Sequence, residues 1–337
     1  MVSDIEHSSS WLPWIKEEGL KHLRDRQFNY SDVENYNNEI QRLGLKEVLV
    51  YRSNKDFVFD LKDIERKLTN NNVKVFVLTA SSNLTGYCPN IVEIGKLVHK
   101  YGAYFLVDAC QFIQHHPINM VDMGIDFLVA SGHKFYAPYS GGFLIGPKEF
   151  FDKFLPYQIG GGNIPYITKD GYILHYQNQL AHDAGTPNAI GAISMAKALE
   201  KLSNIGVDNI NMYETSLTKY VYDEFAGIDK VEMYVKREYL SNIITFNIKG
   251  YDAKGIADLL NNNYGIGVRA GSFCVYHVIR KLLNIKDDSE LVQAIQSGIN
   301  NHIPGVIRAS FSLQNTKKDA VRLVNAIKDI VTKLNTK

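Results

Sequence analysis

The sequence predicts an α/β fold: a three-layer αβα domain with a mostly parallel sheet, followed by a smaller α+β domain. Two observations support this prediction. Between residues 75 and 145, short apolar segments alternate with a helical pattern, as in the strand–helix–strand units of parallel sheets. After about residue 205 this alternation stops, and strands and helices follow in mixed order. We therefore expect a large domain over 1–205 and a small domain over 206–337.

Short apolar, β-branched runs mark the expected strands of the large domain. Asn90 can cap the helix after the first strand, with Glu93 three residues later as in a capping box, and Gly102 is expected to end that helix. A helix from about Ala189 to Leu202 closes the domain. The strands are expected at Val75–Thr79, Ala103–Val107, Phe127–Ala130 and Gly142–Ile145.

The small domain is expected to mix strands and helices. Asn242–Ile248 and Gly265–Val268 are predicted strands, and Asp252 caps a helix that continues through Leu260. Thr316 is expected to cap the closing helix. The apolar residues of that helix recur at helical spacing: Val321, Val324, Ile327, Val331 and Leu334.

The composition is that of an ordinary globular chain. Of 337 residues, 45% are hydrophobic and 22% are charged, and the net charge of +1 indicates neither a nucleic-acid partner nor a membrane surface. The three cysteines, Cys88, Cys110 and Cys274, lack metal-ligand spacing, so neither a metal site nor a disulfide framework is expected. The polar, acidic N-terminal stretch does not read as a signal peptide, and no apolar run reaches the ~20 residues that span a bilayer. We expect a cytoplasmic protein with reduced thiols.

Polar side chains follow two strands of the predicted sheet, at the ends where ligands bind in such folds. Asp108 comes directly after one strand, with Gln111 on the next turn, and the segment SGHK (131–134) follows another. Taken singly, an Asp at a strand end is most often a turn former, and a Lys is nearly always solvated. The order and spacing of the groups carry the prediction.

VDACQ (107–111) followed by SGHK (131–134) resembles the cofactor signature of fold-type I pyridoxal 5′-phosphate (PLP) enzymes, and more narrowly the class V aminotransferase family, which includes cysteine desulfurases. The resemblance implies a PLP-dependent transferase fold and an enzyme that acts on an amino acid, with an active site between its domains at a homodimer interface. Further matching segments are Glu6-His7 with WLPW (11–14), SSNLTG (81–86), HHPINMVDMGIDFLVASGHKFYAP (115–138), AGTPN (184–188), VRAGSFC (268–274) and IRASF (307–311).

The resemblance also implies how the cofactor ring is held. Lys134 would carry PLP as a Schiff base, and Asp108 would pair with the pyridine nitrogen, which makes the ring an electron sink. Gln111 would donate a hydrogen bond to the phenolic oxygen, and His7 would stack on the ring. Asn83 would lie beside the cofactor or the substrate carboxylate.

Two further groups of residues would bind anions. Ser131 and His133 would donate to the cofactor phosphate. Thr186 would reach the phosphate of the partner subunit, although a plain Gly-Thr-Pro turn is the alternative interpretation. Arg308 would bind the substrate carboxylate with its two-pronged guanidinium, and Arg269 is a second candidate for this role.

Cys274 ends an Arg-x-Gly-x-x-Cys run similar to the one that carries the nucleophile of cysteine desulfurases. This similarity implies conversion of L-cysteine to L-alanine with a persulfide on Cys274, which a sulfur-acceptor protein would receive. The following residues, VYHVIRKLL (275–283), differ from the usual desulfurase continuation. Another class V aminotransferase or C–S lyase reaction therefore stays open, with Cys274 as a small buried hydrophobe.

A third hypothesis concerns the phosphate. Family members carry a Gly-Thr-Thr turn ahead of the Glu-His motif, where backbone N–H groups cradle the phosphate. No such turn precedes His7 in this sequence. A non-catalytic or complementing subunit is therefore the alternative expectation.

Overall fold

The fold is seen in a computed structural model that describes residues 1–21, 48–154, 156–173, 179–287, 289–297 and 303–335. Its first part is built on a sheet with the strand order β3-β4-β5-β6. Three of these strands run parallel and β6 runs antiparallel to β5, which confirms the mostly parallel sheet. The strands are β3 (Val75–Thr79), β4 (Tyr104–Asp108), β5 (Phe127–Ser131) and β6 (Gly142–Ile145).

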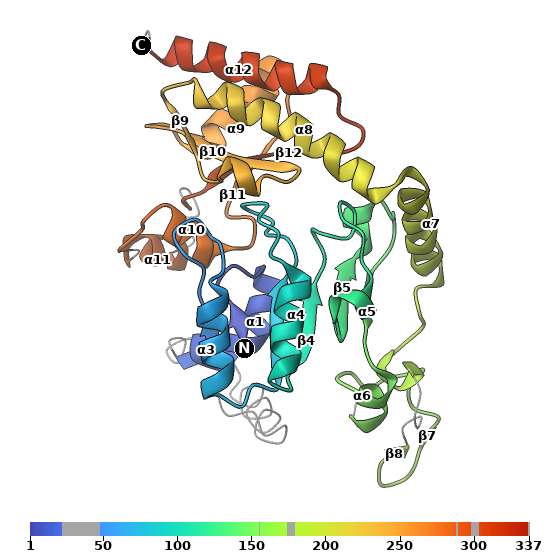
Figure 1. Cartoon of the computed structure of the whole chain (residues 1–337). Coiled ribbons are helices and arrows are strands. Elements are labelled where there is room, and N and C mark those ends of the chain that lie inside the picture. Colours follow the sequence, from blue (N-terminus) through green and yellow to red (C-terminus); the bar gives the residue numbers. More distant parts are fainter. Residues whose placement is uncertain (22–47, 155, 174–178, 288, 298–302, 336–337) are drawn as a thin grey trace.

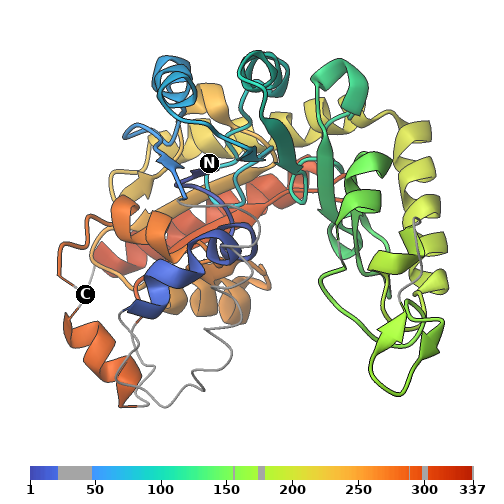
Figure 2. The ribbon, with the colours of Figure 1, turned by 90° about the horizontal axis from the view of Figure 1, so that it is seen from below.

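Helices cover this sheet on both sides. One side carries α3 (Leu61–Asn70), α4 (Ile91–Lys100) and α5 (Met120–Met123), and α1 (Ser8–Lys21) lies on the other (Figure 2). α4 begins as predicted, because Asn90 Oδ1 accepts a hydrogen bond of 3.2 Å from the backbone N–H of Glu93. Gly102 follows the end of α4 with a left-handed φ of 70°.

Two smaller features extend the sheet region. The short strands β1 (Val2–Ser3) and β2 (Val50–Tyr51) pair in parallel, and the N–H of Val77 donates to the carbonyl of Met1, so β1 lies beside β3.

Beyond β6, an arm projects from the body and returns to α7 (Figure 1). It contains α6 (Lys148–Lys153), β7 (Tyr166–Ile167), β8 (Tyr172–Ile173) and the 3₁₀ turn η2 (Gln179–His182). The expected helix after the arm is α7 (Ala189–Ile205).

The C-terminal part has an antiparallel sheet in the order β11-β12-β10-β9. Figure 1 shows α8 and α12 side by side over this sheet. Its strands are β9 (Val231–Met233), β10 (Ile243–Ile248), β11 (Arg269–Gly271) and β12 (Val306–Ser310). Its helices are α8 (Val207–Ala226), α9 (Ala253–Tyr264), α10 (Tyr276–Leu282), α11 (Ser289–Gln296) and α12 (Lys317–Asn335), with the 3₁₀ turn η3 (Arg237–Tyr239).

The strand predicted at Gly265–Val268 is wrong, since the strand in this region is β11, which begins at Arg269. Gly265 has a φ of 61° and caps the C-terminus of α9, where its N–H donates to the carbonyl of Asn261. This left-handed cap reverses the chain, and the extended segment pairs with β12 only after the reversal.

The hydrophobic core is built from clusters that join segments far apart in the sequence. One buried cluster joins β3, β4, α3 and α4, and it also contains Phe273, Val275, Val278 and Ile279 from the segment after β11. A second cluster lies between α8, α9, α12 and the C-terminal sheet. The segment around Cys274 is thus packed against the first part of the molecule. The domain boundary at residue 205 stays a prediction.

None of the described helices is long and apolar enough to span a bilayer.

Candidate active site

A pocket of about 290 Å³ brings together residues from both parts of the molecule. Four of the predicted site residues line it: Gln111, His133, Lys134 and Arg308. The pocket is also lined by Gln114, His115, Tyr136, Asn242, Ile243, Ser310, Phe311, Ser312 and Asn315. Groups from the ends of β4 and β5 therefore face groups from β10 and β12, as expected for a site between two domains.

The strand ends place Asp108 and Lys134 on the same edge of the sheet. β4 ends at Asp108, which is 8% exposed, and its Oδ1 accepts a hydrogen bond of 2.9 Å from the N–H of Cys110. β5 ends at Ser131 and leads into the 3₁₀ turn η1 (Gly132–Phe135), which carries Lys134. Because β4 and β5 are parallel neighbours, their carboxyl ends lie next to each other.

His7 lies within electrostatic reach of both groups. It follows β1 and is half-buried. Burial and the positive charge of Lys134 lower the pKa of His7, while the carboxylate of Asp108 acts in the opposite direction. The structure thus brings His7, Asp108 and Lys134 together, as the sequence predicted.

Ser131 and His133 form a polar pair at the start of η1. The distance from Ser131 Oγ to His133 Nδ1 is 2.9 Å, and the His133 imidazole is exposed and lines the pocket. A hydroxyl and an imidazole beside a lysine make an arrangement that can donate to an anion.

Arg308 on β12 carries a charge in a confined place. Burial first and the charge of Arg269 second lower the pKa of Arg308 to about 10, so the guanidinium stays charged at neutral pH. One of its terminal nitrogens donates to the carbonyl of Asn83 at 2.6 Å, and its carbon lies 4.8 Å from the centre of the Phe273 ring. Its Nε is buried and has no hydrogen-bond partner within the described part of the chain. A planar cation with an unused donor beside a pocket suits a carboxylate.

Asn83 and Arg269 both adjoin Arg308. Asn83 is buried, and its Nδ2 donates to the carbonyl of Phe273 at 2.8 Å. Arg269 is exposed and lies opposite Arg308 in the register of β11 and β12.

Cys274 lies in the turn after β11 and does not line the pocket. It is exposed, so the alternative of a buried hydrophobe does not describe its environment. Burial raises the pKa of the other two thiols, to about 11 for Cys88 and about 12 for Cys110. Cys274 is therefore the most accessible of the three thiols. Its link to the pocket runs through Phe273, which stacks under Arg308.

Thr186 is not brought to this pocket. It lies exposed in the turn before α7, and its predicted contact with a partner subunit stays a prediction.

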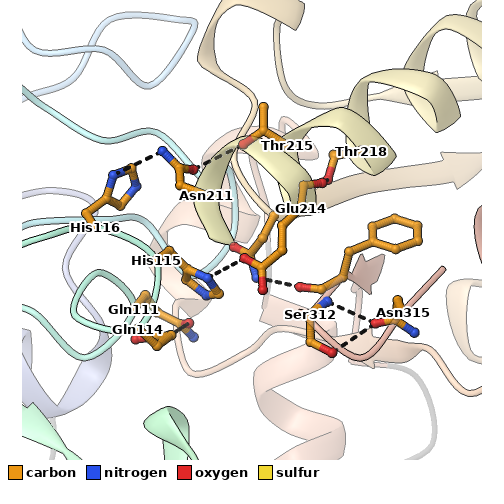
Figure 3. A network of polar contacts seen from close by, with 12 residues as sticks. Gln111, Gln114, His115, His116, Asn211, Glu214, Thr215, Thr218, Ser312 and Asn315 are labelled. Atoms are coloured by element: carbon orange, nitrogen blue, oxygen red, sulfur yellow. Dashed lines mark hydrogen bonds and ion pairs between the residues drawn. The ribbon is translucent and has the colours of Figure 1, made fainter. Parts of the chain in front are cut away.

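Sequence reasoning missed a buried contact between an imidazole and a carboxyl group in the pocket wall. His115 Nδ1 lies 2.6 Å from the carboxylate of Glu214, and the two residues are 5% and 0% exposed. Figure 3 shows this pair between the turn that carries Gln111 and helix α8. Beside it, Asn211 contacts His116 at 3.4 Å. A glutamate in an amphipathic helix gives no local signal of such a partner.

A second buried carboxyl belongs to Glu6, for which the sequence predicted no role beyond its place in the Glu6-His7 motif. It accepts hydrogen bonds from Ser3 Oγ at 2.6 Å and from the N–H of Thr79 at 2.7 Å. Burial raises the pKa of Glu6 to about 7, and the nearby Asp108 adds to the shift. The hydrogen bond from Thr79 fixes Glu6, the residue before His7, to the end of β3.

The side chains of this site fit PLP and an amino acid. A lysine amine, an amide and a guanidinium share the pocket, while a buried carboxylate and an imidazole stand next to the lysine. The phosphate has candidate donors in the Ser131–His133 pair. No group of three or more His, Cys, Asp or Glu side chains placed to hold a metal ion occurs within the described ranges.

Comparisons with known proteins show the family of the chain. The family model described as aminotransferase class-V matches residues 31–323. A probable cysteine desulfurase of Methanothermobacter thermautotrophicus is 27% identical over 98% of this chain and 72% of its own length. A cysteine desulfurase of Wigglesworthia glossinidia brevipalpis is 30% identical over 91% of this chain and 70% of its own length.

Solved structures give the same result. A crystal structure of a cysteine desulfurase from Escherichia coli superposes with a TM-score of 0.78 at 25% identity, covering 99% of this chain and 71% of that chain. The apo structure of a cysteine desulfurase from Thermococcus onnurineus also has a TM-score of 0.78, at 28% identity, covering 98% of this chain and 72% of that chain.

Proposed function

The chain belongs to the aminotransferase class-V family, and from this premise we propose that it is a PLP-dependent cysteine desulfurase. The reaction would convert L-cysteine to L-alanine and leave a persulfide on Cys274. One observation carries the proposal: Lys134 and the half-buried Arg308 line the same pocket, and the Arg308 guanidinium stacks on the residue before Cys274.

The residues at the ends of β4 and β5 would hold the cofactor. Lys134 supplies the amine that would bind it covalently, and Asp108, at the neighbouring strand end, would pair with the pyridine nitrogen. Gln111 and His7 would contact the ring, and the pair formed by Ser131 and His133 would donate to the phosphate. When bound, PLP supplies an electron sink that stabilises negative charge at the substrate α-carbon.

Arg308 would bind the substrate carboxylate. Its guanidinium is held by the carbonyl of Asn83 and by the Phe273 ring, so its orientation is fixed before a substrate arrives. Arg269, opposite Arg308 and exposed, adds positive charge beside Arg308.

Cys274 would take the sulfur. In this step, the deprotonated Cys274 thiol would attack the substrate sulfur. A sulfur–sulfur bond would form, and the substrate carbon–sulfur bond would break. The freed carbon takes a proton and leaves as part of alanine, so Cys274 carries the transferred sulfur. The exposure of Cys274 suits transfer of that sulfur to an acceptor protein. Such chemistry needs reduced thiols, which supports a cytoplasmic location.

We also propose a homodimer. Apolar side chains are exposed along the stretch from β6 to α7: Leu144, Ile145, Tyr157, Tyr166, Ile167, Tyr172, Ile173, Ile190 and Ile193. Apolar surface of this kind marks interaction sites. Thr186 is exposed in the same stretch, and it would reach the phosphate of a second copy bound there, as the family resemblance implies. Light scattering of the purified protein tests the homodimer, because the measured mass should be that of two chains.

The cofactor proposal is tested by the visible spectrum after incubation with PLP. We expect an absorption band in the wild type and none in Lys134→Ala. A band that appears only after a second polypeptide is added would favour a complementing subunit instead. A keto-acid product that keeps the sulfur and persists in Cys274→Ser would favour transamination, and pyruvate with released sulfide would favour a lyase.

A further inference from the structure

The backbone beside Cys274 adopts a conformation that is costly without support. Phe273 has a φ of 51° and Cys274 a φ of 57°, so two consecutive residues with a Cβ lie in the left-handed region. Such residues pay a steric penalty there, and a pair of them persists only where neighbouring groups hold it. The contacts around this turn therefore decide where the thiol points.

Each carbonyl of this pair is held by a residue from the first part of the molecule. The carbonyl of Cys274 accepts two hydrogen bonds from Ser8, one from the backbone N–H at 2.7 Å and one from Oγ at 2.5 Å. The carbonyl of Phe273 accepts from Asn83 Nδ2 at 2.8 Å. The Phe273 ring is buried beneath Arg308.

Ser8 does not use its hydroxyl to cap its own helix. It is the first residue of α1, and its Oγ reaches a carbonyl 266 positions away in the sequence. It also directly follows His7, which lies within electrostatic reach of Lys134 and Asp108. The contact thus joins the cysteine turn to the residues at the proposed cofactor site.

We propose that Ser8 is a positioning residue for Cys274: its hydroxyl, together with the Asn83 amide, locks the left-handed Phe273–Cys274 turn and fixes where the thiol stands. This inference rests on the proposed function for its catalytic consequence, but not for its structural one. Ser8 acts through the Cys274 backbone and does not touch the reacting sulfur atoms.

The test compares Ser8→Ala with Ser8→Thr, which keeps a hydroxyl, and with Ser9→Ala, the same change at the exposed neighbour. Hydrogen exchange of the full chain is followed at residues 272–278, where the amides of Val275 and Val278 donate within the turn. Loss of one hydrogen bond is expected to speed exchange there by roughly 2- to 10-fold in Ser8→Ala. Ser8→Thr and Ser9→Ala should exchange as the wild type does.

The kinetic consequence is measured as alanine formation from L-cysteine. Ser8→Ala should lower kcat by roughly the same 2- to 10-fold factor, with KM unchanged, because Arg308 still binds the carboxylate. Exchange and kcat in Ser8→Ala equal to those of Ser9→Ala would overturn the proposal, and so would faster exchange spread over the whole chain. Exchange is measured without cofactor or substrate, so it is decisive even if Cys274→Ser shows that Cys274 is not the nucleophile.

Discussion

Replacing His115 by Ala should destabilise the protein strongly, because it leaves a carboxylate buried without its partner. Glu214 is 0% exposed and its ion-pair distance to His115 is 2.6 Å. Breaking a buried pair by removing one partner costs about 3–5 kcal/mol. The unfolding entropy of about 2.1 cal/mol/K per residue, multiplied by 337 residues, is about 0.7 kcal/mol/K. The expected fall in Tm is therefore about 4–7 °C.

The assay is thermal unfolding of the cofactor-free chain at neutral pH. A matched control is Lys197→Ala, since Lys197 also lies 2.6 Å from a carboxylate, that of Glu200, but the two side chains are 74% and 57% exposed. An exposed pair contributes about 0–1 kcal/mol, so this Tm should move by less than about 1.5 °C. Adding Glu214→Leu to His115→Ala should recover part of the loss, because the buried charge is removed. A Tm for His115→Ala equal to that of Lys197→Ala would show that the buried contact with Glu214 does not stabilise the fold.

Three further predictions concern the pocket and the thiols. Arg308→Lys should raise KM for L-cysteine by roughly 10- to 150-fold, because Lys cannot give the forked charge-assisted hydrogen bonds to the carboxylate. The PLP absorbance should not change, and an unchanged KM in steady-state assays would contradict the prediction. Burial raises the pKa of Glu6 to about 7, above the value of 4.5 that we take for the unfolded chain. The protonated carboxyl therefore stabilises the fold fully below a pH near 4.5, and this stabilisation is lost as the pH rises through 7. Tm measured from pH 5 to 8 should therefore fall less in Glu6→Gln than in the wild type, and parallel curves would refute the assignment. Iodoacetamide at pH 8 should modify Cys274 first, since Cys274 is exposed and burial raises the pKa of Cys88 and Cys110; peptide mass spectrometry showing equal labelling would exclude this.

The catalytic edge of the sheet could be predicted because its signals are local. Parallel strands place their carboxyl ends together, so Asp108 and the turn that carries Lys134 were expected to meet, and they do. Arg308 entered through the resemblance of its motif, and the structure places it in the same pocket. The predicted strand at Gly265–Val268 failed because an apolar run does not reveal a left-handed helix cap inside it.

Contacts between distant residues had no such signal. The hydroxyl of Ser8 binds the carbonyl of Cys274, and Glu214 pairs with His115, yet each of these residues has an ordinary local pattern. Ser8 reads as part of a helix start, and Glu214 as one of several acidic residues on α8. Only the packing of the C-terminal part on the first part creates these contacts.

The most direct test of the proposed function is alanine formation from L-cysteine by the full chain after incubation with PLP, beside Cys274→Ser at matched visible absorbance. The wild type should form alanine, together with a persulfide on Cys274, and the variant should form no alanine. Equal alanine formation by the two proteins, or none by a wild type that carries the cofactor, would contradict it.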